Sequence, residues 1–375
     1  EIAQCLVGSE MCIRDRPVFA SDDGDTIYIN SVSDLLSLAR NCAYDQWSVG
    51  KTVILQKDLS LEGMLWEPIP SFSGQFKGNG HTISDLTITG QYSPAGLFGI
   101  VEEQGSIESL SVRGVVSVSD SADTTTGGIA GINHGTLISC QFTGVVTGDS
   151  EVGGIVGRNE SEGTIDHGTA RAIVTGKSST GGIAGYNLGA ITGCTNVGSI
   201  NTEYPEASLD TDGFTAKMVD YINNKMAAAD NDATNSVTNV ATDTGGIAGR
   251  SSGMILTSVN TGTIGYEHVG YNVGGIVGRT DGLVSGCVNQ GRVLGRKDVG
   301  GIAGQAEPYR ELDLSKDTIK RLRSELEVLR GLVDDTTGVV ENSTTSISNS
   351  FSAMTSQMDT AIAAARQLDD QARDY

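Results

Sequence analysis

GGIAGINHGTLISCQFTGVVTGDSEVGGIVG, residues 127–157, contains two copies of the pentapeptide that decides the fold. The pentapeptide reads Gly-Gly-Ile-(Ala/Val)-Gly, and its six copies begin at Gly127, Gly153, Gly181, Gly245, Gly274 and Gly300. The intervals between copies are 26, 28, 64, 29 and 26 residues, and the long one equals about one repeat plus an insertion. A period of roughly 20–50 residues is typical of solenoids, propellers and arrays.

Short bursts of β-branched residues fill the space between the pentapeptides, as in Ile191-Thr-Gly-Cys194 and Val284-Ser-Gly-Cys287. They predict strands of a few residues joined by tight turns, and we expect glycine and asparagine to take positive φ at the corners. A repeat of about 26 residues buries no core alone, but coils stacked at roughly 4.8 Å pair their backbones and share one. The sequence predicts an all-β fold, a right-handed parallel β-helix. A propeller is disfavoured because its blades are longer.

The composition excludes several classes of protein. Glycine supplies 50 of the 375 residues, without the three-residue period that collagen requires. Basic residues number 25 and acidic residues 46, a net charge of −21 that argues against nucleic acid and anionic lipid as partners. Because no run of 18 apolar residues occurs, we expect no membrane span in this segment.

Two register positions carry small or amide side chains. The first holds Cys140, Gly168, Cys194, Ser258 and Cys287. We expect it to face inward, with the thiols free. A disulfide or metal site is the alternative, but Cys140 and Cys194 lie two coils apart, about 9–10 Å, beyond the roughly 7 Å limit for a bridge. The second position holds Asn133, Asn159 and Asn187, which predict a stacked amide ladder.

Arginine recurs directly before the predicted amide ladder. Arg158, Arg250 and Arg279 share one register with Ile132 and Tyr186. Because the position also accepts an apolar and an aromatic residue, we expect a solvated face there. The alternative is a basic stripe that binds an acidic ligand.

The six pentapeptides resemble the GLUG motif of bacterial surface proteins, including the non-catalytic parts of immunoglobulin A peptidase-like proteins. Residues 72–88, FSGQFKGNGHTISDLTI, also resemble the opening coil of that family and of pectate-lyase-like β-helices. Together these segments cover roughly residues 50–305. The resemblance implies a β-helix in a secreted or surface protein, without implying one activity.

The N-terminal 49 residues divide into three parts. Residues 1–16 include CLVGSEMCIRDR, which resembles the translation of a transposase adapter, so we expect the native N-terminus to be missing. Residues 17–20, PVFA, are typical of the end of a signal peptide, which favours an extracellular or cell-surface location. Residues 21–49 are expected to form a strand and a capping helix from Leu35 to Asn41, opened by Ser31 and covering the first coil.

Two segments interrupt or follow the repeats. The insertion at about 205–244 has an apolar helical face and is expected to pack on the solenoid flank, with a partner-binding helix as the alternative; that face comprises Phe214, Met218, Tyr221, Ile222 and Met226. Asp230–Asn235 predicts a linker, because it lacks the glycine and terminal glutamate of a calcium loop. Residues 306–375 predict a coiled-coil stalk of about 90 Å that flexes or folds back near Gly338, is truncated, and is a candidate for self-association.

The stalk prediction rests on heptad spacing at Ile319, Leu326, Val333, Val340, Ile347, Met354, Ala361 and Leu368.

The sequence predicts no catalytic, cofactor-binding or metal-binding residue. Acidic residues such as Glu151 and Asp166 do not recur at one register, unlike the clustered acids of β-helix lyases and hydrolases. The four histidines are scattered and include no zinc-binding helix motif; they are His81, His134, His167 and His268.

We therefore expect a non-catalytic surface protein that presents a face to glycans or proteins for adhesion or assembly. The alternatives are a polysaccharide-binding or polysaccharide-degrading β-helix, a mechanical spacer, or the non-catalytic N-terminal region of a larger surface peptidase.

Overall fold

The structure is a computed structural model that describes residues 25–44, 46–118, 124–202, 241–307, 326–328, 330 and 345–373. The chain divides into two compact units, Glu1–Pro308 and Tyr309–Tyr375. The adapter-like segment 1–16, the signal-like segment 17–20 and nearly all of the insertion at 205–244 lie outside the described residues.

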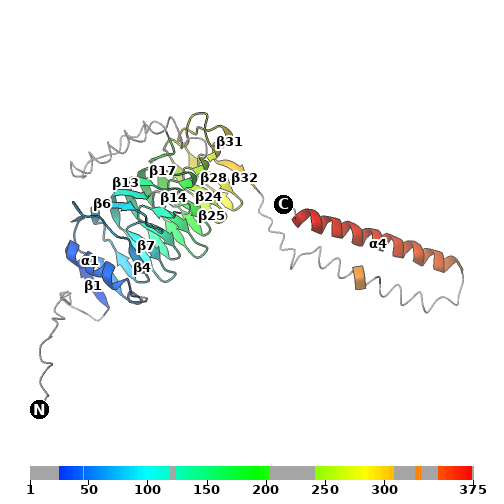
Figure 1. Cartoon of the computed structure of the whole chain (residues 1–375), viewed down its shortest axis with the longest axis horizontal. Coiled ribbons are helices and arrows are strands. Elements are labelled where there is room, and N and C mark those ends of the chain that lie inside the picture. The colour runs from blue at the N-terminus through cyan, green and yellow to red at the C-terminus, as the bar shows by residue number, and fades with distance from the viewer. Residues whose placement is uncertain are drawn as a thin grey trace, which may run out of the picture. The chain divides into compact units, whose positions relative to one another are not determined.

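The first unit is a parallel β-solenoid, which confirms the predicted parallel stacking (Figure 1). Each complete coil passes through four sheets in turn, as in β14 (Ser150–Gly153), β15 (Val156–Asn159), β16 (Thr164–Asp166) and β17 (Thr169–Thr175). Every strand pairs in parallel with the equivalent strand of the neighbouring coil. The solenoid therefore grows by one rung of each sheet per coil.

The four sheets are numbered here in the order in which a coil visits them. Sheet 1 contains β10 (Thr126–Gly127), β14, β18 (Ser178–Gly181), β23 (Thr242–Gly245), β27 (Tyr271–Gly274) and β31 (Lys297–Gly300). Sheet 2 contains β4 (Ile69–Phe72), β7 (Phe98–Val101), β11 (Ala130–Asn133), β15, β19 (Ala184–Asn187), β24 (Ala248–Ser251), β28 (Val277–Thr280) and β32 (Ala303–Ala306).

Sheet 3 contains β1 (Thr26–Ile29), β2 (Thr52–Leu55), β5 (Gln75–Lys77), β8 (Ser106–Glu108), β12 (Thr136–Ile138), β16, β20 (Ala190–Thr192), β25 (Met254–Leu256) and β29 (Leu283–Ser285). Sheet 4 contains β3 (Leu59–Ser60), β6 (Thr82–Gly90), β9 (Ser111–Val118), β13 (Gln141–Thr147), β17, β21 (Thr195–Asn196), β26 (Val259–Asn260) and β30 (Val288–Asn289). In addition, β22 (Ser199–Ile200) pairs with β17.

The pentapeptides form the corner between sheets 1 and 2, and their first glycines pair in one row from Gly127 to Gly300. None of the pentapeptide glycines has a positive φ, whereas Gly193 and Gly286, which separate short strands between pentapeptides, have the positive φ expected there. The pentapeptide requires glycine because neighbouring backbone atoms lie too close to leave room for a Cβ. A Cβ on Gly153 would overlap the carbonyl oxygen of Val156, and one on Gly182 would overlap that of Gly246 in the next coil.

In every coil from β8 onward, the residue at the corner between sheets 3 and 4 has a left-handed backbone conformation, with positive φ. Ser139, His167 and Thr257 have φ of 53°, 52° and 47°, and only Gly193 and Gly286 in this row are glycine, with φ of 62° and 65°. A left-handed conformation brings Cβ close to the following carbonyl oxygen, which costs about 1–2 kcal/mol per residue.

Thr257→Gly is therefore expected to raise the free energy of unfolding by about 1 kcal/mol. The side chain of Thr257 is exposed, and its backbone N–H donates to the Ser285 carbonyl in either variant. Chemical denaturation measures the effect. Thr257→Ala keeps Cβ and is the control. An equal gain in both variants would show that the left-handed backbone is not the cause.

Helix α1 (Val32–Asn41) packs against β1 and β4 at the N-terminal end of the stack (Figure 1). Its N-cap is Ser31, whose Oγ accepts the Asp34 N–H at 3.2 Å, as the sequence indicates. Leu35 and Leu38 are fully buried, so the helix extends the core beyond the first strands.

The opposite end of the stack is open within the described residues. Ile302 is 42% exposed, whereas Ile276, its equivalent one coil earlier, is completely buried. A Cβ on Gly301 would meet nothing within 4 Å, unlike the other second glycines of the motif. Among the described residues, nothing covers the last coil in the way that each earlier coil is covered by the next one.

The second unit contains helix α4 (Thr345–Arg373). Arg366 pairs with Glu327 at 3.8 Å and Arg330 pairs with Asp359 at 2.8 Å, so the helical residues near 327 run antiparallel beside α4. The unit folds back on itself rather than extending as one rod, and a coiled coil stays a prediction. Among the described helices, none combines the length and apolar character needed to cross a membrane.

Candidate functional site

A row of three arginines and one tyrosine lies on the outer face of sheet 2. The register pairs Arg158 with Tyr186, Tyr186 with Arg250, and Arg250 with Arg279, and we call these four residues the arginine–tyrosine row. The guanidinium carbons of Arg158 and Arg250 each lie 5.1 Å from the centroid of the Tyr186 ring. Stacking of the coils thus creates a cation–π cluster.

An acidic row runs beside it on sheet 1. Glu151, Ser179, Asp243, Asn272 and Asp298 occupy equivalent positions in successive coils, all with φ between 47° and 56°. The expectation that acidic residues do not recur at one register is therefore wrong for Glu151. The sequence signal was available, because each of these residues lies two positions before a pentapeptide.

Two arginines of the row are neutralised by carboxylates. Arg158 pairs with Glu151 at 2.8 Å and Glu160 at 2.7 Å, and Arg279 pairs with Glu307 at 3.0 Å. Burial lowers the pKa of Arg158, but the charges of Glu151 and Glu160 more than offset it and hold that pKa above its ordinary value. The hydrogen bond to Glu307 likewise raises the pKa of Arg279.

Arg250 differs from both. Within the part of the chain that the structure describes, no carboxylate lies within ion-pair distance of its guanidinium, which instead covers one face of Tyr186. Nearby Asp243 accepts from the Asn272 amide at 2.6 Å. Arg250 is thus a half-exposed cation held by an aromatic face.

The predicted amide ladder lies directly beneath the row. Asn133 Nδ2 donates to Asn159 Oδ1 at 2.8 Å, and Asn159 Nδ2 donates to Asn187 Oδ1 at 2.8 Å. Asn187 Nδ2 continues to Ser251 Oγ at 3.0 Å. All four residues are fully buried, so the ladder fixes the strands that carry the row.

A second amide ladder was missed by the sequence reasoning. Asn196 Nδ2 donates to Asn260 Oδ1 at 2.7 Å, and Asn260 Nδ2 donates to Asn289 Oδ1 at 2.8 Å. Each amide also donates to the carbonyl of the glycine two residues later, at Gly198, Gly262 and Gly291. The repeated Asn-x-Gly was the available signal.

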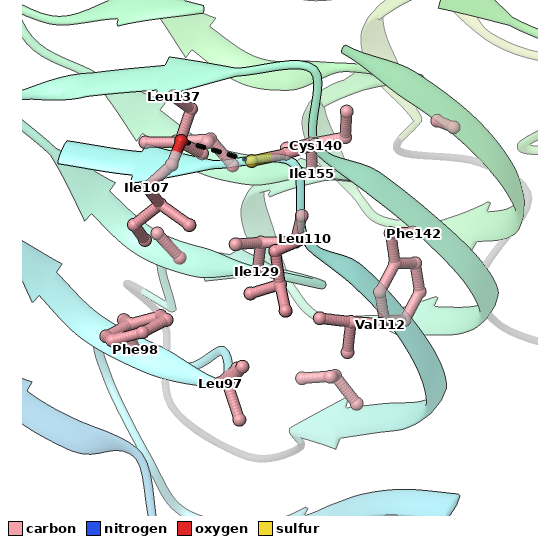
Figure 2. Close-up of a cluster of buried hydrophobic side chains, with 14 of the residues drawn as sticks. Leu97, Phe98, Ile107, Leu110, Val112, Ile129, Leu137, Cys140, Phe142 and Ile155 are labelled. Atoms are coloured by element: carbon pink, nitrogen blue, oxygen red, sulfur yellow. Dashed lines mark hydrogen bonds between the residues drawn. The ribbon is translucent and has the colours of Figure 1, made fainter. Parts of the chain in front are cut away.

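The cysteines of the repeats face inward as free thiols, as expected. Figure 2 shows Cys140 in the hydrophobic core near Ile107 and Leu137, where its Sγ donates to the Ile107 carbonyl at 3.3 Å. Burial raises the pKa of both Cys140 and Cys194 to about 12. These thiols are therefore protonated at neutral pH and are poor nucleophiles.

In the native chain, Cys140 and Cys194 are expected to resist alkylation at neutral pH, whereas half-exposed Cys287 is modified. Peptide mapping by mass spectrometry distinguishes the sites, and the denatured chain is the control. Because the folded pKa values are raised, the unfolded thiols ionise first, so stability falls as pH rises from about 9 towards 12. Rapid labelling of native Cys140 would contradict the buried placement.

The histidines lie at separate places. His81 Nδ1 is 3.1 Å from Asp58 Oδ1, and His167 Nδ1 is 2.9 Å from Asp166 Oδ1. Over the described ranges, no three His, Cys, Asp or Glu side chains gather to hold a metal ion. Asp230–Asn235 lies outside those ranges.

A polar cavity of about 420 Å³ lies between the loop after α1, β4 and the turn after β7. Its lining includes Ser71, whose Oγ donates to Glu102 Oε1 at 2.7 Å, together with Glu103 and Gln104. No basic, histidine or cysteine side chain is among its described lining residues. An acid–base pair there would have to come from the adjacent residues Glu102 and Glu103.

No family model matches the chain. The chain is 30% identical to "Halomucin" of Haloquadratum walsbyi over 155 residues, which is 38% of this chain and 2% of that protein. It is 27% identical over 192 residues to a "Putative Gly-rich membrane protein" of Evansella cellulosilytica, covering 40% of this chain and 22% of that one. The matches thus span less than a quarter of either relative.

Among solved structures, a "putative immunoglobulin A1 protease" from Bacteroides ovatus aligns with 75% of this chain and 83% of its own, at 16% identity and a TM-score of 0.47. By sequence, the chain is thus similar to limited segments of two much longer proteins.

Proposed function

We propose that the chain is a non-catalytic, secreted or cell-surface β-solenoid protein that presents a rigid surface for adhesion or assembly. The observation that carries this proposal is the exact-register arginine–tyrosine row, which the buried amide ladder holds at a fixed spacing from coil to coil. Such a surface is preorganised, so binding of a ligand along it costs little conformational entropy of the protein.

The names of the relatives support a surface location. One is named as a membrane protein and the other as a halomucin, and both are much longer than the matched segments. Repeats that form one part of a long chain fit a display role.

We further propose membership of the GLUG-motif family, a right-handed coil, and self-association through the second unit. The stacked pentapeptides support membership of the GLUG-motif family. A right-handed coil follows from the strong preference of parallel crossovers for that hand. Self-association through a coiled coil in the second unit is supported by the exposed apolar side chains of Val328 and Met354. Light scattering of the purified chain tests the last statement, and a monomer at all concentrations contradicts it.

The experiment has two arms. Antibody labelling of intact cells is expected to detect the solenoid without permeabilisation. The purified full chain is expected to bind members of a glycan and surface-protein array while leaving them chemically unchanged. Release of unsaturated sugars from a polyuronate would overturn the proposal in favour of a lyase, and absence of any binding would favour a mechanical spacer.

A further inference from the structure

We infer that Arg250 is a binding site for the acid group of an anionic polysaccharide, a carboxylate or sulfate ester carried on a sugar. This inference rests on the proposed function and names the ligand class for its surface. Among the three arginines of the row, only Arg250 has no carboxylate partner within the described residues, although Arg158 and Arg279 occupy the same register one or two coils away.

The contrast between these arginines is the first step. Arg158 has two carboxylates within 2.8 Å, and Arg279 has one at 3.0 Å. Their charges are therefore already compensated, and an incoming anion would have to displace Glu151, Glu160 or Glu307. Arg250 offers its hydrogen-bond donors without that competition. A guanidinium presents a planar fork that matches carboxylate and sulfate oxygens.

Preorganisation is the second step. The Tyr186 ring lies between the guanidinium groups of Arg158 and Arg250, each 5.1 Å from its centroid. Tyr186 Oη is also 3.3 Å from Ser252 Oγ, two residues beyond Arg250. The aromatic face holds Arg250 in place but uses none of its in-plane donors. Ser252 adds a hydroxyl next to the site.

The surroundings favour a sugar polymer over an acidic protein. Protein interfaces usually have an apolar centre, whereas both ring faces of Tyr186 are already covered by guanidinium groups. The adjacent acidic row also carries hydroxyl and amide groups at Ser179 and Asn272. These groups can donate hydrogen bonds to, and accept them from, sugar hydroxyls.

The extended shape of the row favours a polymer. Coils are spaced at about 4.8 Å along the axis. A polysaccharide that lies along sheet 2 therefore passes Tyr186, Arg250 and Arg279 in succession. Because the row contains a single arginine without a carboxylate partner among the described residues, the binding is expected to be specific to position and only weakly dependent on salt.

The test measures binding of the full chain to polygalacturonate, dextran sulfate, neutral dextran and poly-L-glutamate by calorimetry. Arg250→Gln is expected to weaken binding to one or both anionic polysaccharides about tenfold or more, because a hydrogen bond to a charged group is lost. Arg250→Lys is expected to retain part of the affinity. Arg292→Gln makes the same charge change at an exposed arginine after β30 and is expected to have an effect below about twofold.

Preference for polygalacturonate or for dextran sulfate identifies the acid group, and either supports the inference. Equal losses in Arg250→Gln and Arg292→Gln would overturn it, since they indicate general charge attraction. Equally tight, Arg250-dependent binding of poly-L-glutamate would overturn the sugar class in favour of an acidic protein. If neither anionic polysaccharide binds while a neutral glycan or protein does, the inference fails and the proposed function stands. Cleavage of polygalacturonate by the chain would contradict the proposed non-catalytic function itself.

Circular dichroism of each variant checks that the solenoid is intact. The side chain of Arg250 is half-exposed, so its replacement is not expected to disturb the core.

Discussion

Replacing Gly246 with alanine is expected to lower the free energy of unfolding by about 3 kcal/mol, the upper part of the usual range for overpacking a tight site. The added Cβ would overlap the Gly275 carbonyl oxygen of the next coil and lie 2.5 Å from Asn260 Cγ. Neither group is the free end of a flexible side chain. The coils must separate, which weakens sheet pairing and the second amide ladder together.

Gly301→Ala is the matched control, because Gly301 is the same motif position in the last coil and its Cβ would meet nothing within 4 Å. Its effect is expected to stay below about 0.5 kcal/mol, typical of a surface substitution. Thermal and urea denaturation of the full chain, followed by circular dichroism, compare the two. Equal losses would mean that close approach of neighbouring coils is not what excludes a side chain at Gly246.

Replacing Asn159 with aspartate is expected to destabilise the solenoid by about 3–5 kcal/mol at neutral pH, the cost of an uncompensated buried charge. Asn159 is fully buried, and its amide donates to Asn187 Oδ1 and the Gly163 carbonyl. Aspartate has nearly the same shape but turns both donors into acceptors. It therefore places oxygen against oxygen in the middle of the ladder.

The effect should depend on pH. Burial raises the pKa of such a carboxyl in the folded state, so the penalty is smallest near pH 4 and grows as pH rises above the unfolded value of about 3.9. Asn289→Asp, at the half-buried end of the second ladder, is the control and is expected to cost about 1 kcal/mol. A pH-independent loss at Asn159 would argue against a buried carboxylate.

The start of the first ladder shows how its length is set. Within the described part of the chain, Asn133 Oδ1 has no hydrogen-bond partner, because the equivalent residue in the preceding coil is Val101. The ladder continues through Asn159 and Asn187 and passes to the hydroxyl of Ser251. Beyond Ser251 the side-chain ladder does not continue among the described residues, because the Thr280 hydroxyl donates to the backbone carbonyl of Ser251 instead.

Several features of the site were predictable because they depend on a repeat copied in register. The Asn133–Asn159–Asn187 ladder follows from one offset after the pentapeptide, and the inward row of Cys140 and Cys194 follows from another. The acidic row and the Asn-x-Gly ladder obeyed the same logic. The acidic row was missed because its register holds mixed residues, such as Ser179 among Asp243 and Asp298.

The sequence by itself determined the coil period, the inward face and the stacking of equivalent residues, because parallel pairing places each repeat directly over the last. Only the tertiary structure decided why the pentapeptide needs glycine, since overlap with the Val156 or Gly275 carbonyl depends on how closely the backbones approach at the corner. It alone also separated Arg250 from Arg158 and Arg279, because the carboxylates that neutralise them come from different offsets, and side-chain reach fixes which charges meet.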